Sequence, residues 1–103
     1  MTGIQNTEAS FFIGNVVLDI HIPFSSSLKE KRMVLKSIKE KLKAKFNVAV
    51  AEVGNQDLWQ SAVLVITTVA PEKGQAEKVI DTVVNFVESH FPEIYINVYK
   101  EII

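Results

Sequence analysis

Few residues of the types that perform enzyme chemistry occur in this sequence, and their spacing does not bring them together. His21 alternates with Asp19 on a predicted strand and serines lie nearby, which is the composition of a nucleophilic triad. No glycine-bound turn that would expose a nucleophilic serine accompanies them. Glu52 and Asp57 flank a predicted turn and are a candidate acid–base pair, but roles in the turn and in an edge strand explain both. We therefore expect a protein that is not an enzyme and has no catalytic residues.

Metal and thiol chemistry is equally poorly supplied. The chain contains no cysteine, which excludes disulfides, thiolate metal sites and a cysteine nucleophile. Its two histidines, His21 and His90, are far apart in sequence and make a poor metal pair. His90 ends a predicted helix, where the helix dipole favours a cationic side chain. We expect no metal site and no cofactor.

Positive charge is the strongest chemical signal. Residues 25–46 hold eight basic and two acidic residues, whereas the rest of the chain holds three basic and ten acidic residues. On a helix, five of these basic residues form one line beside the apolar face. We call this line the basic ridge, and it consists of Lys29, Arg32, Lys36, Lys39 and Lys43. It would bind nucleic-acid phosphates with strong salt dependence and little specificity. The alternative is a solvated helix face whose long side chains cover core residues.

The elements that would position these residues follow a β-α-β-β-α-β order. Apolar periodicity and turn residues predict strands and helices over residues 11–22, 28–45, 47–53, 61–69, 71–91 and 95–102. Ser27 and Glu30 fit a capping box at the start of the first helix. Its apolar stripe contains Leu28, Leu35, Ile38, Leu42 and Phe46. Residues 1–10 are polar and unpatterned, so we expect a flexible tail followed by a single domain over residues 11–103.

Two β-α-β halves with right-handed crossovers build an α+β, ferredoxin-like sandwich. We expect a four-stranded antiparallel sheet of strand order 4-1-3-2, with both helices on one face. Its second strand has an ambiguous parity, because both of its alternating sets are largely apolar. No apolar run is long enough to span a bilayer, and the N-terminus lacks the pattern of a signal peptide. We expect a cytoplasmic protein that does not bind membranes.

The sheet face without helices needs either water or a partner. Alternation places on it Val17, Asp19, His21, Val63, Val65, Thr67, Tyr95, Asn97 and Tyr99. RNA-binding sheets of this topology carry stacking aromatics on their central strands, where this chain has valine, aspartate, histidine and threonine. We therefore expect a homodimer or partner interface made by Val17, Val63, Val65 and Tyr95. An ordinary wet face with a few exposed valines is equally compatible with the pattern.

Trp59 lies beside the predicted hairpin turn after the second strand. An aromatic residue there either pins the hairpin to the core or forms a contact hot spot. We expect the packing role, and keep Trp59 as a candidate interface residue.

Two long motifs carry a resemblance to a known family. The first reads His-x-Pro-x-Ser-x-Ser-Leu-Lys-x-Lys-Arg over residues 21–32, and the second reads Ala-Glu-Val-x-x-x-Asp-Leu-Trp-Gln over residues 51–60. With the helix and strand of residues 76–103, they resemble the YlxP-like family of small bacterial proteins of unknown function. The resemblance covers residues 13–103 and implies a ferredoxin-like fold. It supplies no catalytic residues. Genes of this family often neighbour those of translation and ribosome-maturation factors, which implies a role connected with RNA or the ribosome.

These observations support two main hypotheses. The first is a non-enzymatic module, dimeric, that presents the basic ridge to structured RNA or the ribosome. The second is a protein-binding or self-assembling adaptor that uses the open sheet face and Trp59. A hydrolase of acylphosphatase type shares the topology, but such enzymes use an arginine and an asparagine around a phosphate loop. Arg32 is the single arginine of the chain, so we do not expect this activity.

Overall fold

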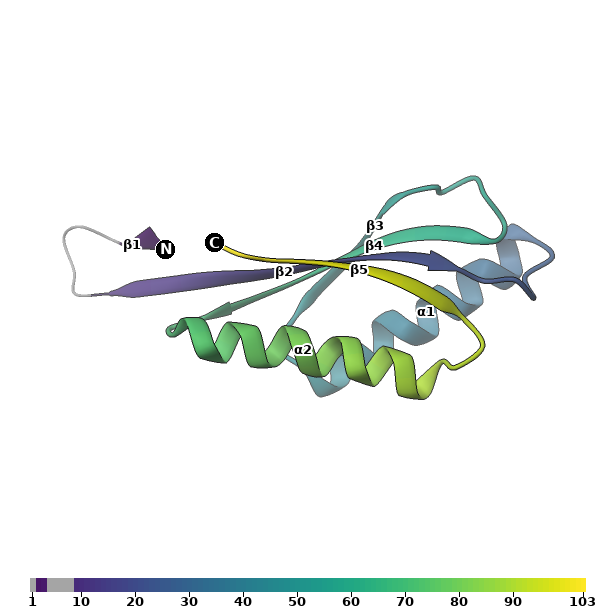
Figure 1. Ribbon diagram of the computed structural model, residues 1–103. Helices are drawn as coiled ribbons and strands as arrows, with labels where there is room; N and C mark the ends of the chain where they lie inside the picture. The colour runs from purple at the N-terminus through teal and green to yellow at the C-terminus, as the bar shows by residue number, and fades with distance from the viewer. Residues whose placement is uncertain (1, 4–8) are drawn as a thin grey trace.

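The chain alternates strands and helices in the predicted order (Figure 1). The structure is a computed structural model that describes residues 2–3 and 9–103. Its elements are β1 (Thr2–Gly3), β2 (Ser10–His21), α1 (Leu28–Lys45), β3 (Ala49–Gly54), β4 (Ser61–Ala70), α2 (Lys73–His90) and β5 (Tyr95–Ile102). The β-α-β-β-α-β prediction is therefore confirmed, with boundaries that differ by at most two residues.

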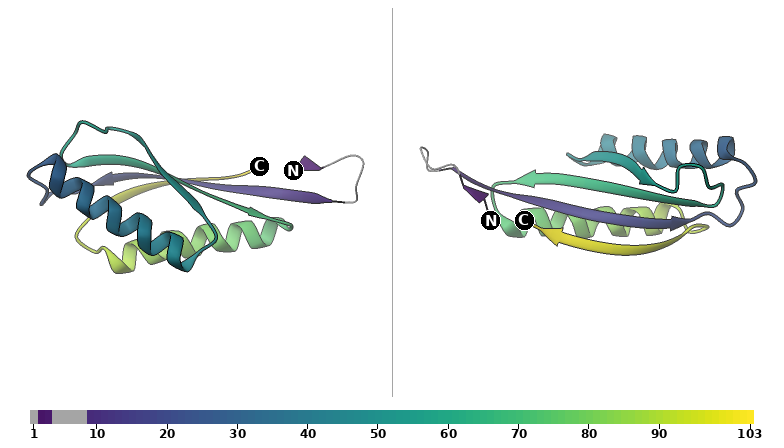
Figure 2. Two further views of the ribbon diagram at one scale, coloured as in Figure 1. Left: turned by 180° about the vertical axis from the view of Figure 1, so that it is seen from behind. Right: turned by 90° about the horizontal axis from the view of Figure 1, so that it is seen from above.

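The main sheet has the strand order β5-β2-β4-β3, and every neighbouring pair is antiparallel. This is the predicted order 4-1-3-2, with β2 and β4 in the centre. Both helices of the described chain lie on one face of the sheet, as Figures 1 and 2 show. Helix α2 packs on β2, β4 and β5, whereas α1 packs on β3. The fold is the ferredoxin-like α+β sandwich. No helix of the described residues covers its second sheet face, the open face predicted from the sequence, which we call the bare sheet face.

Strand β2 begins one residue earlier than predicted and extends past the helices. Its first residues, Ser10 and Phe11, pair with Gly3 and Thr2 of the short strand β1. The predicted flexible tail covers residues 1–10, and most of it, residues 1 and 4–8, lies outside the described residues.

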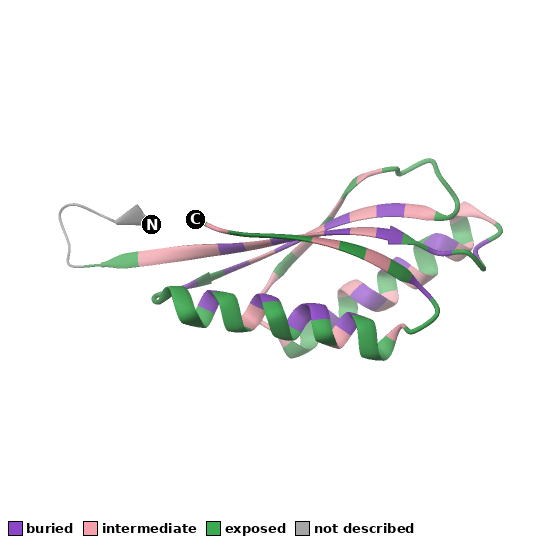
Figure 3. Cartoon of the chain, viewed as in Figure 1, coloured by how far each residue is buried: buried purple, intermediate pink, exposed green. Residues whose placement is uncertain are grey.

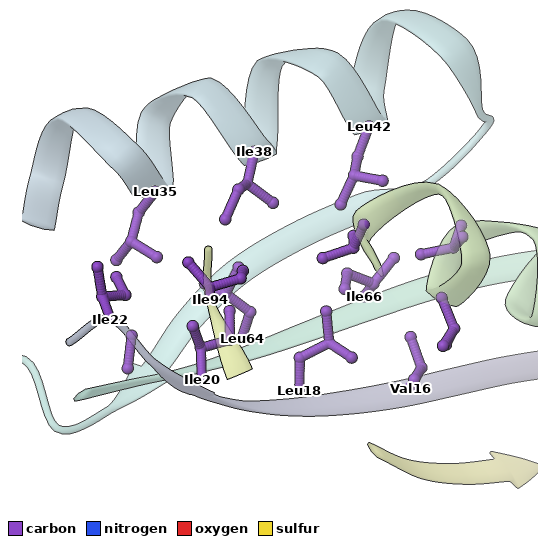
Figure 4. Close-up of a cluster of buried hydrophobic side chains, with 14 of the residues drawn as sticks. Val16, Leu18, Ile20, Ile22, Leu35, Ile38, Leu42, Leu64, Ile66 and Ile94 are labelled. Carbon is purple, nitrogen blue, oxygen red and sulfur yellow. The ribbon is translucent and has the colours of Figure 1, made fainter. Parts of the chain in front are cut away.

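The core lies between the sheet and the helices (Figure 4). Alternate residues of β2 point towards the helices and are fully buried, as expected for a sheet with one covered face. Leu35, Ile38 and Leu42 project from α1 onto this layer. Helix α2 buries one face, which comprises Ala76, Ile80, Val83, Val84 and Val87.

The start of α1 shows the predicted cap with one difference. The backbone N–H of Glu30 donates to the Ser27 hydroxyl over 3.0 Å, as a capping box requires. The Glu30 carboxylate, however, accepts from the backbone N–H and hydroxyl of Ser26, at 3.3 and 2.8 Å, and so ties down the residue before the cap. The prediction that Leu28 opens the buried stripe is wrong. Leu28 is half-buried, and Lys31 takes the buried position next to Leu35.

Candidate functional site

The basic ridge forms one line along α1, as its spacing predicts. Lys29, Arg32, Lys36 and Lys43 are exposed, and Lys39 is half-buried. Among the ridge residues the structure shows one ion pair, in which the Lys36 Nζ lies 3.9 Å from Glu40 Oε1 with both side chains in solvent. Such exposed pairs contribute little, so the ridge remains available for anionic ligands.

The other three basic residues of this segment are occupied by contacts within the protein. Lys41 lies over the Phe91 ring, with its Nζ 5.2 Å from the ring centroid. Lys45 lies over the Phe86 ring at 5.0 Å. Both rings belong to the α2 side of the molecule, and cation–π contacts of this kind hold the charges in place. The ridge therefore lies on the opposite flank of α1, away from α2.

Lys31, the third of these residues, is fully buried at 0% exposure. Its Nζ donates to the carbonyl oxygens of Asn55, Gln56 and Ser61, at 2.9, 3.3 and 3.1 Å. An ammonium group has three hydrogens, so these bonds use all of them. Glu52 Oε2 lies 3.2 Å from the same nitrogen and accepts no hydrogen bond from the described residues. The carboxylate therefore neutralises the buried charge while the carbonyls supply the directional bonds.

This buried ammonium is not identified from the sequence, because Lys31 is grouped there with the other basic residues and not with the apolar stripe of α1. Lys31 precedes Leu35 by four residues and continues the spacing of Leu35, Ile38 and Leu42. A lysine on an apolar stripe needs an internal partner, since a buried charge without one is very costly. Glu52 is the acidic residue of the otherwise apolar strand β3, and it indicates where such a partner lies.

Two of the carbonyls that hold Lys31, those of Asn55 and Gln56, belong to the connection between β3 and β4, and the third, that of Ser61, is the first of β4. We call residues 55–60 the Trp59 loop. Asn55 begins it with a φ of 60°, a conformation that asparagine tolerates better than most residues. Gln60 ends it and donates through Nε2 to the carbonyl oxygens of Pro23 and Ser25, both at 3.1 Å. The loop is thus fixed from both sides, by α1 through Lys31 and by the β2–α1 connection through Gln60.

Every residue of the Trp59 loop is exposed (Figure 3). Trp59 is 56% exposed and Leu58 is 52% exposed. The expectation that Trp59 packs into the core is therefore wrong. The rigid backbone holds two large apolar side chains in solvent, which is the arrangement of a contact surface.

A shallow pocket of about 470 Å³ lies beside Trp59 and reaches the bare sheet face. His21 contributes to it from the end of β2, and the ring centroid of His21 is 6.3 Å from that of Tyr95. Asp57 lines the same pocket, whereas Glu52 points inward to Lys31. The candidate acid–base pair Glu52 and Asp57 is thus separated by the fold.

The bare sheet face carries one apolar row across all four main strands. Val17 pairs with Val65 on one side and with Tyr99 on the other. Ala51 pairs with Val65 and completes the row, which settles the parity of β3: Ala49, Ala51 and Val53 face outward. The predicted interface residues Val63 and Tyr95 lie in neighbouring rows, opposite Asp19 and His21. The structure therefore brings Val17, Val63, Val65 and Tyr95 onto one face, with Trp59 in the loop at its end.

Metal and membrane chemistry receive no support from the described residues. Within residues 2–3 and 9–103, no group of three or more histidine, cysteine, aspartate or glutamate residues is arranged to hold a metal ion. No helix in the described part of the chain combines the length and apolar character needed to cross a membrane.

His90 stacks on Phe86, and its Nδ1 lies 3.0 Å from the Phe86 carbonyl oxygen at the end of α2.

Solved structures with a similar fold include two designed proteins and one natural protein. A de novo designed protein with a ferredoxin fold, LFR1 1, has a TM-score of 0.58 and 13% identity, over 86% of this chain and 84% of its own. The designed protein Foldit4 has a TM-score of 0.52 and 13% identity, over 89% and 97% of the two chains. A C-terminal segment of the aIF2 alpha subunit from Pyrococcus abyssi has a TM-score of 0.57 and 14% identity, over 94% and 54%. At these identities the likeness shows the fold alone.

The sequence comparisons agree with the motifs at residues 21–32 and 51–60. The model of the family described as "Protein of unknown function (DUF503)" matches residues 13–100. The uncharacterized protein YlxP of Bacillus subtilis (strain 168) is 46% identical over 70 residues, which are 68% of this chain and 75% of YlxP. The chain therefore belongs to the YlxP-like family of bacterial proteins, DUF503, as its two motifs indicate.

Proposed function

We propose that this protein is a non-enzymatic, cytoplasmic binding module that associates with structured RNA or the ribosome through the basic ridge. The observation that carries the proposal is the division of charge on α1. Five basic side chains follow one flank of the helix, whereas Lys31 is buried and Lys41 and Lys45 lie over the rings of Phe91 and Phe86. A structural role explains the second set and leaves the first without one.

Lysine and arginine side chains bind nucleic acids mainly through phosphates, with release of counterions. The ridge runs from Lys29 to Lys43 of α1, a length of about 21 Å at about 1.5 Å per residue. Several successive phosphates of a duplex fit along this distance. The bare sheet face is a poorer RNA surface, because Asp19 lies near its centre and would repel phosphates.

A titration of ribosomal RNA fragments at two salt concentrations tests the proposal. The double variant Lys36→Glu/Lys43→Glu should weaken binding strongly, and the affinity of the wild type should fall steeply with salt. Lys73→Glu/Lys78→Glu is the matched control, because it reverses the same charge on exposed positions of α2. Equal losses in both variants would indicate diffuse electrostatics, and absence of binding at low salt would refute the proposal.

A second candidate function is self-association through the bare sheet face. The row of Tyr99, Val17, Val65 and Ala51 favours it, because β-branched and aromatic residues suit packing of one sheet on another. Val65→Lys would place a charge in this row without touching the core. Sedimentation at micromolar concentrations should then show a dimer for the wild type and a folded monomer for the variant. A monomeric wild type would refute this candidate.

A further inference from the structure

We propose that Lys31 is a positioning residue for self-association. It fixes the Trp59 loop, which forms the second half of the homodimer interface. The inference rests on the second candidate function above and adds a specific part of the chain to it. The occupant of the surface is a second copy of this protein.

The Trp59 loop and the bare sheet face are one continuous surface. Strand β4 begins at Ser61, directly after the loop, and pairs with His21 of β2. His21 lines the pocket beside Trp59 and pairs with Tyr95 of β5. The surface therefore continues from the row of Val17 and Val65 through Val63, His21 and Tyr95 to Trp59, with Asp19, Asn97 and Ser61 as polar residues between them. A sheet face that approaches a twofold-related copy brings this loop along with it.

The sheet face and the Trp59 loop together offer an area of the size that a stable dimer needs. Four strands about 4.8 Å apart and eight residues long, at about 3.3 Å per residue, give a footprint of roughly 500 Å². Stable interfaces bury about 800 Å² on each partner. A large aromatic residue buries about 150–250 Å², and Trp59 and Leu58 are both more than half exposed. The loop therefore adds apolar area at the end of the sheet face.

Lys31 makes this loop ready to bind. A loop of six exposed residues would ordinarily lose conformational freedom on association, and this loss weakens binding. The buried ammonium donates to the carbonyl oxygens of Asn55 and Gln56 at the start of the loop and to that of Ser61 directly after its end, which fixes both ends of the loop before a partner arrives. Lys31 has no access to the surface, so it acts on association only through the backbone that it holds.

Analytical ultracentrifugation of full-length variants over a concentration series tests the inference. Trp59→Ala should raise the dimer dissociation constant about tenfold or more, as removal of a contact hot spot does. The double variant Lys31→Met/Glu52→Gln, which removes both buried charges, should raise it to a similar extent. Combining this double variant with Trp59→Ala should raise the dissociation constant little further, because both changes remove the same contact. Met33→Ala is the control: Met33 is 65% exposed on α1, and its removal should leave the constant unchanged.

Gln60→Ala keeps the test decisive if the double variant does not fold. It removes only the hydrogen bonds to the carbonyl oxygens of Pro23 and Ser25, and its effect on dimerisation should also vanish in the Trp59→Ala background. In Lys31→Met/Glu52→Gln and in Gln60→Ala, amide hydrogen exchange should become faster only at the amides of the Trp59 loop. An undiminished effect of Lys31→Met/Glu52→Gln in the Trp59→Ala background would overturn the positioning role. Dissociation by Val65→Lys without any effect of Trp59→Ala would overturn the inference and keep the second candidate function.

Discussion

The Lys31 ammonium and the Glu52 carboxylate lie 3.2 Å apart between α1 and β3, and Lys31 is closed off from solvent. Burying such a pair is costly, and removing one partner leaves the other charge without compensation. The pair joins the first helix to an edge strand at the place where the Trp59 loop begins. Both the fold and the proposed contact surface therefore depend on it.

Lys31→Met should destabilise the protein by about 3–5 kcal/mol, because it leaves the Glu52 carboxylate buried without its partner. Lys31→Met/Glu52→Gln should recover part of this loss, since no uncompensated charge remains. Urea denaturation monitored by circular dichroism gives both values. A single variant as stable as the wild type would show that the pair contributes nothing to the fold.

Leu35→Ala should cost about 2–5 kcal/mol, the range for removing a buried leucine side chain. Leu35 is 2% exposed and faces β2 across the core. Met33→Ala, two residues earlier on the exposed side of the same helix, should change stability by about 0.5 kcal/mol or less. Equal denaturation midpoints for the two variants would contradict the buried face of α1.

Ser27→Ala should cost about 1 kcal/mol, because the Glu30 amide loses its acceptor at the first turn of α1. Ser27→Asp should retain most of the stability, since aspartate also caps helices and favours the helix N-terminus. Thermal unfolding of the three proteins at one pH measures the difference. If alanine and aspartate behaved alike, the hydroxyl would not be the cap.

Asp19→Asn should strengthen self-association through the bare face. Asp19 is half-buried between Val63 and Asn97 of the neighbouring strands, and a second sheet laid on it would desolvate the carboxylate. We expect the dissociation constant to fall roughly tenfold, about 1.4 kcal/mol. Asp81→Asn on the exposed side of α2 is the control, measured in the same sedimentation series. Weaker association of Asp19→Asn would instead show that the carboxylate makes a favourable contact across the interface.

Much of this fold could be predicted from the sequence, because strict alternation marks a strand with one covered face. Val16, Leu18 and Ile20 alternate with Val17, Asp19 and His21, and β2 has this arrangement in the structure. Strand β3 lacked such contrast, since valine and alanine occupy both of its faces. Its parity became clear only from its register with β4.

The candidate site was less accessible to prediction. The basic ridge follows from helical spacing, and the structure places its five residues on one line. Trp59 lies in a loop, where no periodicity distinguishes a packed aromatic from an exposed one. Its exposure depends on the backbone geometry that Lys31 and Gln60 impose over 24 to 37 residues of sequence separation. Contacts across such separations are a property of the tertiary structure.

The placement of both described helices on one side of the sheet has a consequence for valency. In a dimer joined through the bare faces, the two helical layers would lie on opposite outer sides, and each would carry its own basic ridge. The two ridges would lie on the flanks of separate helical layers, with both sheets between them, and would not form one continuous track. The dimer would instead be a bivalent bridge between two RNA segments. Once one segment is bound, a second segment linked to it would have a raised effective concentration at the other ridge, while the strength of each contact stays the same.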